Sequence, residues 1–114
     1  PLLLIGLATT QLSIAETGGE MSQKFNLAAE KNLRKALRLD PANATAYFQL
    51  SKAFGQMQRV AYAKWALAEY FALLGRPESL KHARRALKGL PEGSPEKIRA
   101  LDILEIARAG GAGR

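Results

Sequence analysis

The stretch that decides the fold occurs twice, as LRKALRLDP at residues 33–41 and as ARRALKGLP at residues 83–91. An Arg, an Ala-Leu pair and a closing Pro recur at the same offset. Small residues let a neighbouring helix approach closely, and Pro follows a helix end because it cannot continue the helix. A repeat at a fixed offset indicates thin helical units that bury their apolar faces by stacking, as in a solenoid.

Length and composition favour a single helical domain. The chain has 114 residues, of which 47% are hydrophobic and only 7% aromatic, and it is rich in Ala and Leu. It contains no Cys, which excludes disulfides and thiolate metal sites. No apolar run reaches about 18 residues, so we predict no membrane span. The formal net charge of +7 favours acidic partners or surfaces.

Apolar periodicity and stop signals divide the chain into six helices within a domain over 1–109. We expect them near 2–17, 22–39, 43–57, 60–74, 77–90 and 95–108, with a flexible tail over 110–114. Short connections make consecutive helices antiparallel neighbours. The two copies of the repeat start three helices apart, which is one and a half helix–turn–helix units. The helix at 60–74 must therefore serve as the second helix of one unit and as the first helix of the next. Ser22, Asn43 and Ser94 are the expected caps.

One apolar stripe per helix forms the predicted core. The stripes are Leu4, Ala8, Leu12 and Ala15; Phe25, Ala29, Leu33 and Ala36; Tyr47, Leu50, Phe54 and Met57; Ala63, Leu67, Tyr70 and Leu74; Leu80, Ala83, Leu87 and Leu90; and Ile98, Leu101 and Leu104.

These features resemble tetratricopeptide repeats, which are helix–turn–helix units of about 34 residues. The best match spans 44–77, where Tyr47 stands in the bulky position of the first helix and Ala63 in the small position of the second. Tyr70 stands where alanine is usual, and Gly75 replaces the closing proline. The resemblance implies an all-α, right-handed solenoid of about six antiparallel helices that binds peptides or proteins in its groove.

A narrower resemblance covers nearly the whole chain. AEYFALLGR at 68–76 and P-x-G-S-P-x-x-x-R-A-x-D-I at 91–103 look like the C-terminal repeat region of bacterial zinc-dependent peptidases with an N-terminal HExxH domain. The resemblance implies a non-catalytic tail of an exported protease that recruits or positions substrates or envelope partners. It implies a periplasmic or cell-envelope location, with the cytoplasm left open, and places any zinc in a catalytic domain of a longer protein.

The chain itself offers no catalytic or metal-binding set. Its one histidine, His82, lies among Lys81, Arg84 and Arg85, which repel a cation, so we interpret it as a solvated surface histidine. The serines carry no local signature of a nucleophile. We therefore expect this chain to be no enzyme and to hold no cofactor or metal.

The groove positions of the 44–77 unit are the candidate protein-binding residues: Thr45, Phe48, Gln49, Lys52 and Gln56, joined by Lys64, Trp65 and Phe71 if the next helix also lines the groove. Phe48 lies outside the core stripe and is a candidate anchor for a peptide. The alternatives are that Phe48 packs against a neighbouring helix and that Trp65 belongs to the core.

Basic residues on the second and fifth helices form a predicted outer face: Arg34, Lys35, Arg38, Arg84, Arg85 and Lys88. Such a face is commonly just solvated, and the functional alternative is docking to acidic protein, anionic lipid headgroups or nucleic acid. No aromatic residue interleaves with these charges in the sequence, which counts against single-strand binding.

Three further alternatives concern function and partner. The chain could be a stand-alone adaptor built from the same repeats, or, less favoured, a basic helical nucleic-acid-binding protein. Its groove could be filled by the catalytic domain of its own parent protein. The apolar opening, residues 2–5, favours a first helix cut from a longer protein and could drive homodimer formation.

Overall fold

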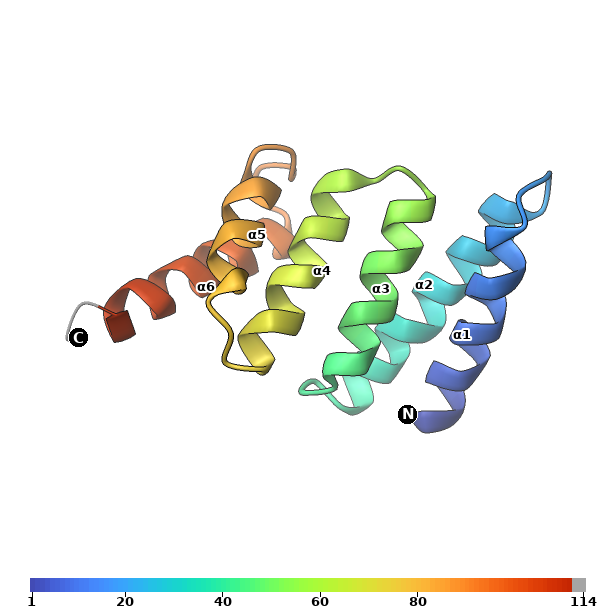
Figure 1. Ribbon diagram of the computed structural model, residues 1–114, viewed down its shortest axis with the longest axis horizontal. Helices are drawn as coiled ribbons and strands as arrows, with labels where there is room; N and C mark the ends of the chain where they lie inside the picture. Colours follow the sequence, from blue (N-terminus) through green and yellow to red (C-terminus); the bar gives the residue numbers. More distant parts are fainter. Residues whose placement is uncertain (112–114) are drawn as a thin grey trace.

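The computed structural model describes residues 1–111, which form six α-helices and no strand (Figure 1). The helices are α1 (Leu2–Glu16), α2 (Ser22–Leu39), α3 (Ala44–Gln56), α4 (Val60–Leu73), α5 (Glu78–Leu87) and α6 (Pro95–Gly111). The predicted all-α class is confirmed, and the right-handed solenoid stays a prediction. The molecule is elongated, with extents of 49 × 28 × 22 Å.

The helix ends follow the expected signals with four differences, the first being that α5 ends at Leu87 and not near the predicted residue 90. α6 continues to Gly111, beyond the predicted end near residue 108, and the rest of the predicted tail, 112–114, lies outside the described residues. Pro77 precedes the first residue of α5 instead of being that residue. Ser22 is the first residue of α2 and not its cap, and its hydroxyl donates to the Ala15 carbonyl at 2.9 Å.

The other two predicted caps are confirmed. The Asn43 Oδ1 atom accepts a hydrogen bond from the Ala46 N–H at 3.0 Å, and the Ser94 Oγ atom accepts one from the Lys97 N–H at 3.1 Å. Each side chain satisfies a backbone donor that the first turn of a helix leaves free. These caps fix where α3 and α6 begin, and they lie two residues after Pro41 in the first copy of the repeat and three residues after Pro91 in the second.

Contacts between helices recur every three helices. α2 packs extensively on α1 and less on α3, and α1 also touches α3; α5 has the same relation to α4 and α6, and α4 touches α6. We call α1–α3 the first unit and α4–α6 the second unit. Within the described residues, α3 and α4 are the only pair of helices whose backbones pack between the units. α4 packs about equally on α3 and α5, the double role that the repeat offset predicts.

The repeat in the sequence is also a repeat in burial. The buried faces match position by position: Ala29, Leu33 and Ala36 in α2, and Ser79, Ala83 and Ala86 in α5. One terminal hydrogen bond also recurs, since the Asp40 N–H donates to the Ala36 carbonyl at 2.8 Å and the Leu90 N–H donates to the Ala86 carbonyl at 3.1 Å, although α5 itself ends earlier, at Leu87. α2 and α5 are therefore equivalent helices of the two units.

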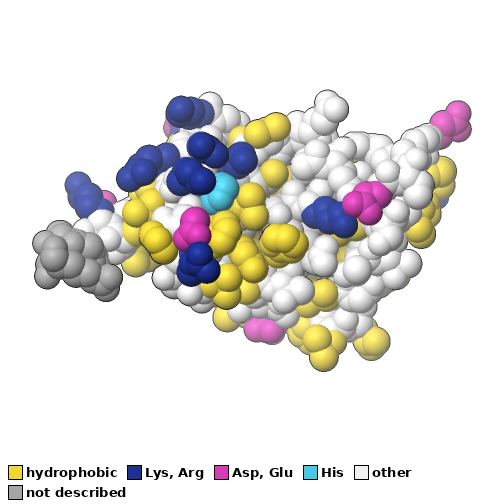
Figure 2. Space-filling model, viewed as in Figure 1, with side chains coloured by type: hydrophobic (Ala, Val, Ile, Leu, Met, Phe, Trp, Pro, Cys, Tyr) yellow, Lys and Arg dark blue, Asp and Glu magenta, His cyan; other side chains and the backbone are white. Residues whose placement is uncertain are grey.

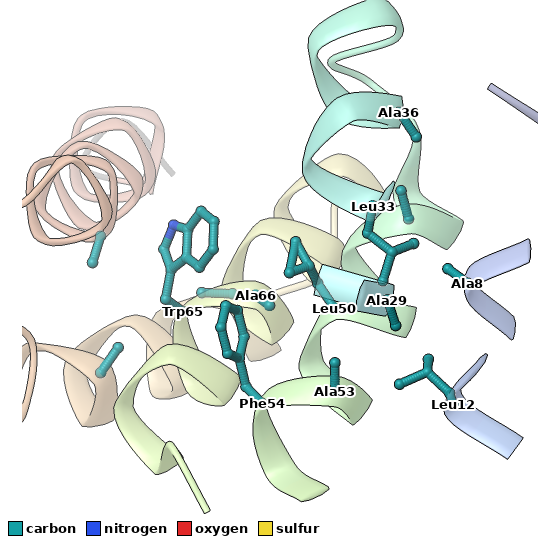
Figure 3. Close-up of a cluster of buried hydrophobic side chains, with 14 of the residues drawn as sticks. Ala8, Leu12, Ala29, Leu33, Ala36, Leu50, Ala53, Phe54, Trp65 and Ala66 are labelled. Atoms are coloured by element: carbon teal, nitrogen blue, oxygen red, sulfur yellow. The ribbon is translucent and has the colours of Figure 1, made fainter. Parts of the chain in front are cut away.

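Small side chains line the helix contacts (Figure 3). Of the nineteen buried hydrophobic residues, eleven are alanines, so neighbouring helices approach closely along most of their length. Larger residues fill the centre, and the figure shows Leu12, Leu50 and Phe54 directed into the same cluster. The stripes predicted for α1, α2 and α3 lie in this core or pack against it, apart from partly buried Phe25.

The predicted apolar faces of α4 and α6 are largely wrong, since only Ala63 and Leu104 of their predicted residues pack against the core. The buried residues of α4 are Trp65, Ala66, Ala68 and Glu69. Leu74 is 48% exposed at the end of α4, and Ile98 and Leu101 of α6 are about half exposed. α4 has neighbours on several sides and α6 has them on one, so the positions of neighbours decide which residues are buried.

Glu69 is a buried carboxylate that joins α4 to α6. It accepts hydrogen bonds from the Arg99 Nε atom at 2.9 Å and the Arg99 Nη2 atom at 2.8 Å, in a two-pronged pair. The Trp65 Nε1–H group donates to the same carboxylate at 3.2 Å. The hydrogen bond to Glu69 raises the pKa of Arg99. Three donors thus satisfy a charge that could not otherwise be buried.

Arg34, predicted on a solvated outer face, instead connects the two units. Its Nε atom lies 2.9 Å from a Glu30 oxygen, and its Nη1 atom lies 3.1 Å from a Glu96 oxygen on α6. The guanidinium also lies over the rings of Phe54 and Trp65, at 5.7 and 5.8 Å from their centroids. It borders a hollow of about 260 Å³ between α2 and α6. This position is partly buried because the start of α6 lies near α2.

Replacing Arg99 with Met is expected to lower the free energy of unfolding by about 3 kcal/mol, because it leaves Glu69 buried without its charged partner. Urea denaturation followed by circular dichroism measures the loss. The double variant Glu69→Leu/Arg99→Met should recover most of it, since the uncompensated charge is gone. A double variant as unstable as Arg99→Met would refute this account of the pair.

Gly89 marks a contact that the first unit lacks. A Cβ atom added at Gly89 would lie 2.9 Å from the Ala61 Cβ atom, so α4 and the end of α5 would have to separate. The equivalent residue fifty positions earlier, Leu39, is 62% exposed. We expect Gly89→Ala to cost about 1–3 kcal/mol by thermal or urea unfolding. The matched control Leu39→Ala should stay within about 0.5 kcal/mol, and equal effects would contradict the contact.

Candidate interaction face

Aromatic and basic side chains, gathered on one face, are the groups that could act together. Among residues 1–111, no three His, Cys, Asp or Glu side chains are arranged to hold a metal ion. No helix in that range has the length and apolar character needed to cross a membrane. The face is built by α3, α4 and α5, which lie side by side in Figure 1.

Four rings form a continuous row across these helices, which we call the aromatic row: Phe48 on α3, Tyr70 and Phe71 on α4, and His82 on α5. Consecutive ring centroids are 5.2, 5.1 and 5.4 Å apart. Phe48 is 47% exposed, and the other three side chains are partly buried. Rings at these separations support one another, so the row is a rigid, partly apolar surface.

Cations border the His82 end of the row. We call them the α5 cluster: Lys64 of α4, and Lys81, Arg84, Arg85 and Lys88 of α5. Figure 2 shows basic side chains gathered around the single histidine, beside hydrophobic ones. None of the ion pairs in the described part of the chain involves these five residues. The cluster is thus a positive surface without an ion pair of its own. The acid near it is Glu78, which pairs with Arg76 and acts electrostatically on Lys81 and His82.

His82 is not the solvated residue that we predicted. Its ring is stacked on Phe71, with an interplanar angle of 6°, and its Nδ1 atom is buried without a hydrogen-bond partner in the protein. Burial is the main cause that lowers the pKa of His82, and Lys64, Lys81 and Arg85 lower it further. The imidazole therefore behaves as a neutral, largely apolar ring at neutral pH.

The groove residues predicted on α3 share one side of that helix, beginning at the aromatic row. Thr45 and Phe48 are exposed, while Gln49, Lys52 and Gln56 are partly buried. The Lys52 Nζ atom lies 3.2 Å from a Glu16 oxygen, so it joins α3 to the end of α1. Phe48 fits both of its predicted roles, packing against a neighbouring helix and anchoring a peptide. Its ring contacts Tyr70 and still exposes about half of its surface.

Two of the sequence predictions for binding residues need correction. Trp65 is only 6% exposed and belongs to the core, so it is no part of an open groove, whereas Lys64 borders the row. The predicted basic outer face is not one surface, since α2 and α5 lie apart in Figure 1 and Arg34 is partly buried and paired with Glu96. Lys35 and Arg38 remain exposed on α2, and Arg84, Arg85 and Lys88 remain exposed on α5.

The main feature that the sequence did not indicate is the meeting of rings and cations. Tyr70 was assigned to the core, and no aromatic residue was expected near the α5 charges. Phe71 and His82 are eleven positions apart, and only the antiparallel packing of α4 on α5 brings them together. The one available signal was Tyr70-Phe71, two adjacent rings on a helix that cannot both face the same core.

A larger hollow of about 740 Å³ lies on another side of α4, between α4, α5 and α6. Its lining is mainly apolar and includes Leu73 and Ile106, which are 42% and 67% exposed. Its two arginines are already paired, Arg99 with Glu69 and Arg76 with Glu78. The aromatic row is the stronger candidate because its neighbouring cations have no such partners.

Comparison with models of protein families, with curated proteins and with solved structures gives no match to this chain. What the face does is therefore argued from its own residues.

The lowered pKa of His82 predicts a pH dependence of stability. The unfolded chain takes up the proton near the ordinary value of 6.5, whereas the folded chain does so at lower pH. Protonation thus favours unfolding, and the free energy of unfolding should decrease as the pH falls below 6.5 through the folded-state pKa. Urea titrations at several pH values measure this decrease, and His82→Gln should remove it.

Proton NMR of the ring gives a direct check, because His82 is the only histidine. A midpoint at or above 6.5 would contradict the buried, stacked position described above.

Proposed function

We propose that the chain is a non-catalytic protein-interaction module, which binds a segment of a partner protein across the aromatic row. The observation that carries the proposal is Phe48, an apolar ring that is 47% exposed at the end of a row spanning three helices. Half-exposed rings on a rigid frame are typical of the residues that dominate binding energy in protein interfaces.

The scaffold supports this role by holding the rings in place before a partner arrives. Phe48 contacts Tyr70, which contacts Phe71 on the same helix, and the helices beneath them meet through alanines. Little side-chain freedom remains to be lost on binding, so the burial of apolar surface translates into affinity more fully than at a mobile loop.

The wider setting that we propose is the C-terminal tail of an exported zinc-dependent peptidase, where the module recruits or positions substrates or envelope partners. The resemblance described above supports it, and the segment AEYFALLGR supplies Tyr70 and Phe71 of the row as well as Glu69. The gene upstream should then encode an HExxH domain. A complete gene without one would leave a stand-alone adaptor as the function.

The binding function is tested with a photo-crosslinking amino acid in place of Phe48. We expect illumination in an extract of the source cells to yield discrete protein adducts, because a partner would lie directly on this ring. Leu27 on α2 is a matched control position, since it is 46% exposed and no member of the row. Adducts are separated by gel electrophoresis and identified by mass spectrometry.

Adducts at position 48 that are absent at position 27, and that an excess of unlabelled chain suppresses, are the expected result. Equal labelling at both positions would mean that the contacts are nonspecific, and no adduct at position 48 would refute the proposed site. Circular dichroism of each variant confirms that it is folded, which an exposed substitution should allow.

A further inference from the structure

The two units provide an internal comparison for the aromatic row. The repeat places Asn32 in α2 where His82 stands in α5. The Asn32 Nδ2 atom donates to the Gln11 Oε1 atom of α1 at 3.0 Å, so the first unit makes this helix contact with a polar pair. The second unit makes it with the stacked rings of His82 and Phe71. The fold therefore does not require aromatic residues at this place.

The cations of α5 repel one another, and the fold relieves this cost only in part, through Glu78 near Lys81 and through the helix dipole at Arg84 and Arg85. Lys81 and Lys88 each stand three and four residues from the adjacent pair Arg84 and Arg85, so the four lie along one side of the helix. Like charges at these spacings destabilise a helix. Lys64 of α4 and Lys81 and Arg85 of α5 all lie close enough to His82 to affect its charge, so the cluster converges on the end of the row. A negatively charged partner would relieve this repulsion.

We propose that the partner segment is an acidic peptide, whose carboxylates bind Lys64, Lys81 and Arg85 while an apolar side chain a few residues away packs against Phe48 and Tyr70. This inference rests on the proposed function and specifies the partner. The row has three ring-to-ring steps of 5.1–5.4 Å, so an extended peptide of at most about five residues spans it. The acidic and apolar residues should therefore be close in sequence.

The geometry favours a peptide over a single-stranded nucleic acid. Bases bind by stacking on exposed ring faces, and here one face of Phe71 is covered by His82, while Tyr70 lies between Phe48 and Phe71. Of the four rings in the aromatic row, Phe48 is exposed and the other three are partly buried. Phosphates would also need cations along the whole strand, whereas the α5 cluster lies at one end of the row.

The test selects ligands for the whole chain from a displayed library of random peptides. We expect the selected peptides to be rich in Asp and Glu, with a Leu, Phe or Trp within about five residues of the acidic positions. A labelled selected peptide is then titrated with the chain by fluorescence anisotropy. Lys81→Glu/Arg85→Glu should weaken its binding at least about tenfold, and the weakening should shrink as salt is added.

The repeat supplies the matched control, because Lys31 and Lys35 of α2 occupy the positions equivalent to Lys81 and Arg85 and are also exposed. Lys31→Glu/Lys35→Glu changes the net charge equally and should alter the affinity by less than about twofold. Equal losses of affinity in the two double variants would mean that only the net charge of the chain matters, which would overturn the inference. Tighter binding of a single-stranded DNA oligonucleotide, or of vesicles containing phosphatidylglycerol, with displacement of the peptide, would overturn it as well.

The selection also separates this inference from the proposed function. Peptides that are neutral or basic, and whose binding is lost in Phe48→Ala but kept in Leu27→Ala, would leave the binding function standing and refute the acidic partner. A selection that yields no peptide dependent on Phe48 would refute both.

Discussion

Close approach of helices through alanine is the constraint on which the structure depends. Wherever two helices meet, at least one side of the contact is usually a methyl group, as at Ala8, Ala29, Ala53 and Ala66 in Figure 3. Such contacts bring backbones near one another and leave little space for rearrangement. The larger residues then have fixed places, with Leu50 and Phe54 in the centre and Trp65 directed towards α6. These contacts beneath the aromatic row hold its rings in place.

Ion pairs join the helices at the places where alanines do not line the contact. Glu69 and Arg99 join α4 to α6 around Trp65, and Arg34 reaches from α2 to Glu96 beneath the same tryptophan. Buried ion pairs contribute less to stability than to the choice of one arrangement, because a partner moved out of place leaves a charge unsatisfied. Trp65 thus lies between the Glu69–Arg99 pair and the Arg34–Glu96 pair. This position explains why its side chain is buried, although the sequence made it a candidate for the groove.

The sequence predicted the class, the six helices, two of the caps and the equivalence of α2 and α5, because these depend on local signals or on repetition. It also predicted the buried stripe of α2, whose apolar and polar sides differ clearly. It failed for α4, which is apolar nearly all round, so that periodicity alone does not show which side faces α3, α5 or α6. It failed for Arg34 and His82 for a related reason: their surroundings come from other helices, α6 for Arg34 and α4 for His82. The candidate anchor Phe48 could be predicted because an apolar residue outside the stripe is visible without any knowledge of neighbours.

The joint between the two units has a mechanical consequence. Within the described residues one pair of helices, α3 and α4, carries the packing between the units, and across the hollow between α2 and α6 the connection is made by the side chains of Arg34 and Glu96. Bending at α3 and α4 would change the angle between the units without disturbing the packing inside either unit. Phe48 lies on one side of that joint and Tyr70 on the other. A ligand that contacts both rings would therefore fix the angle between the two units.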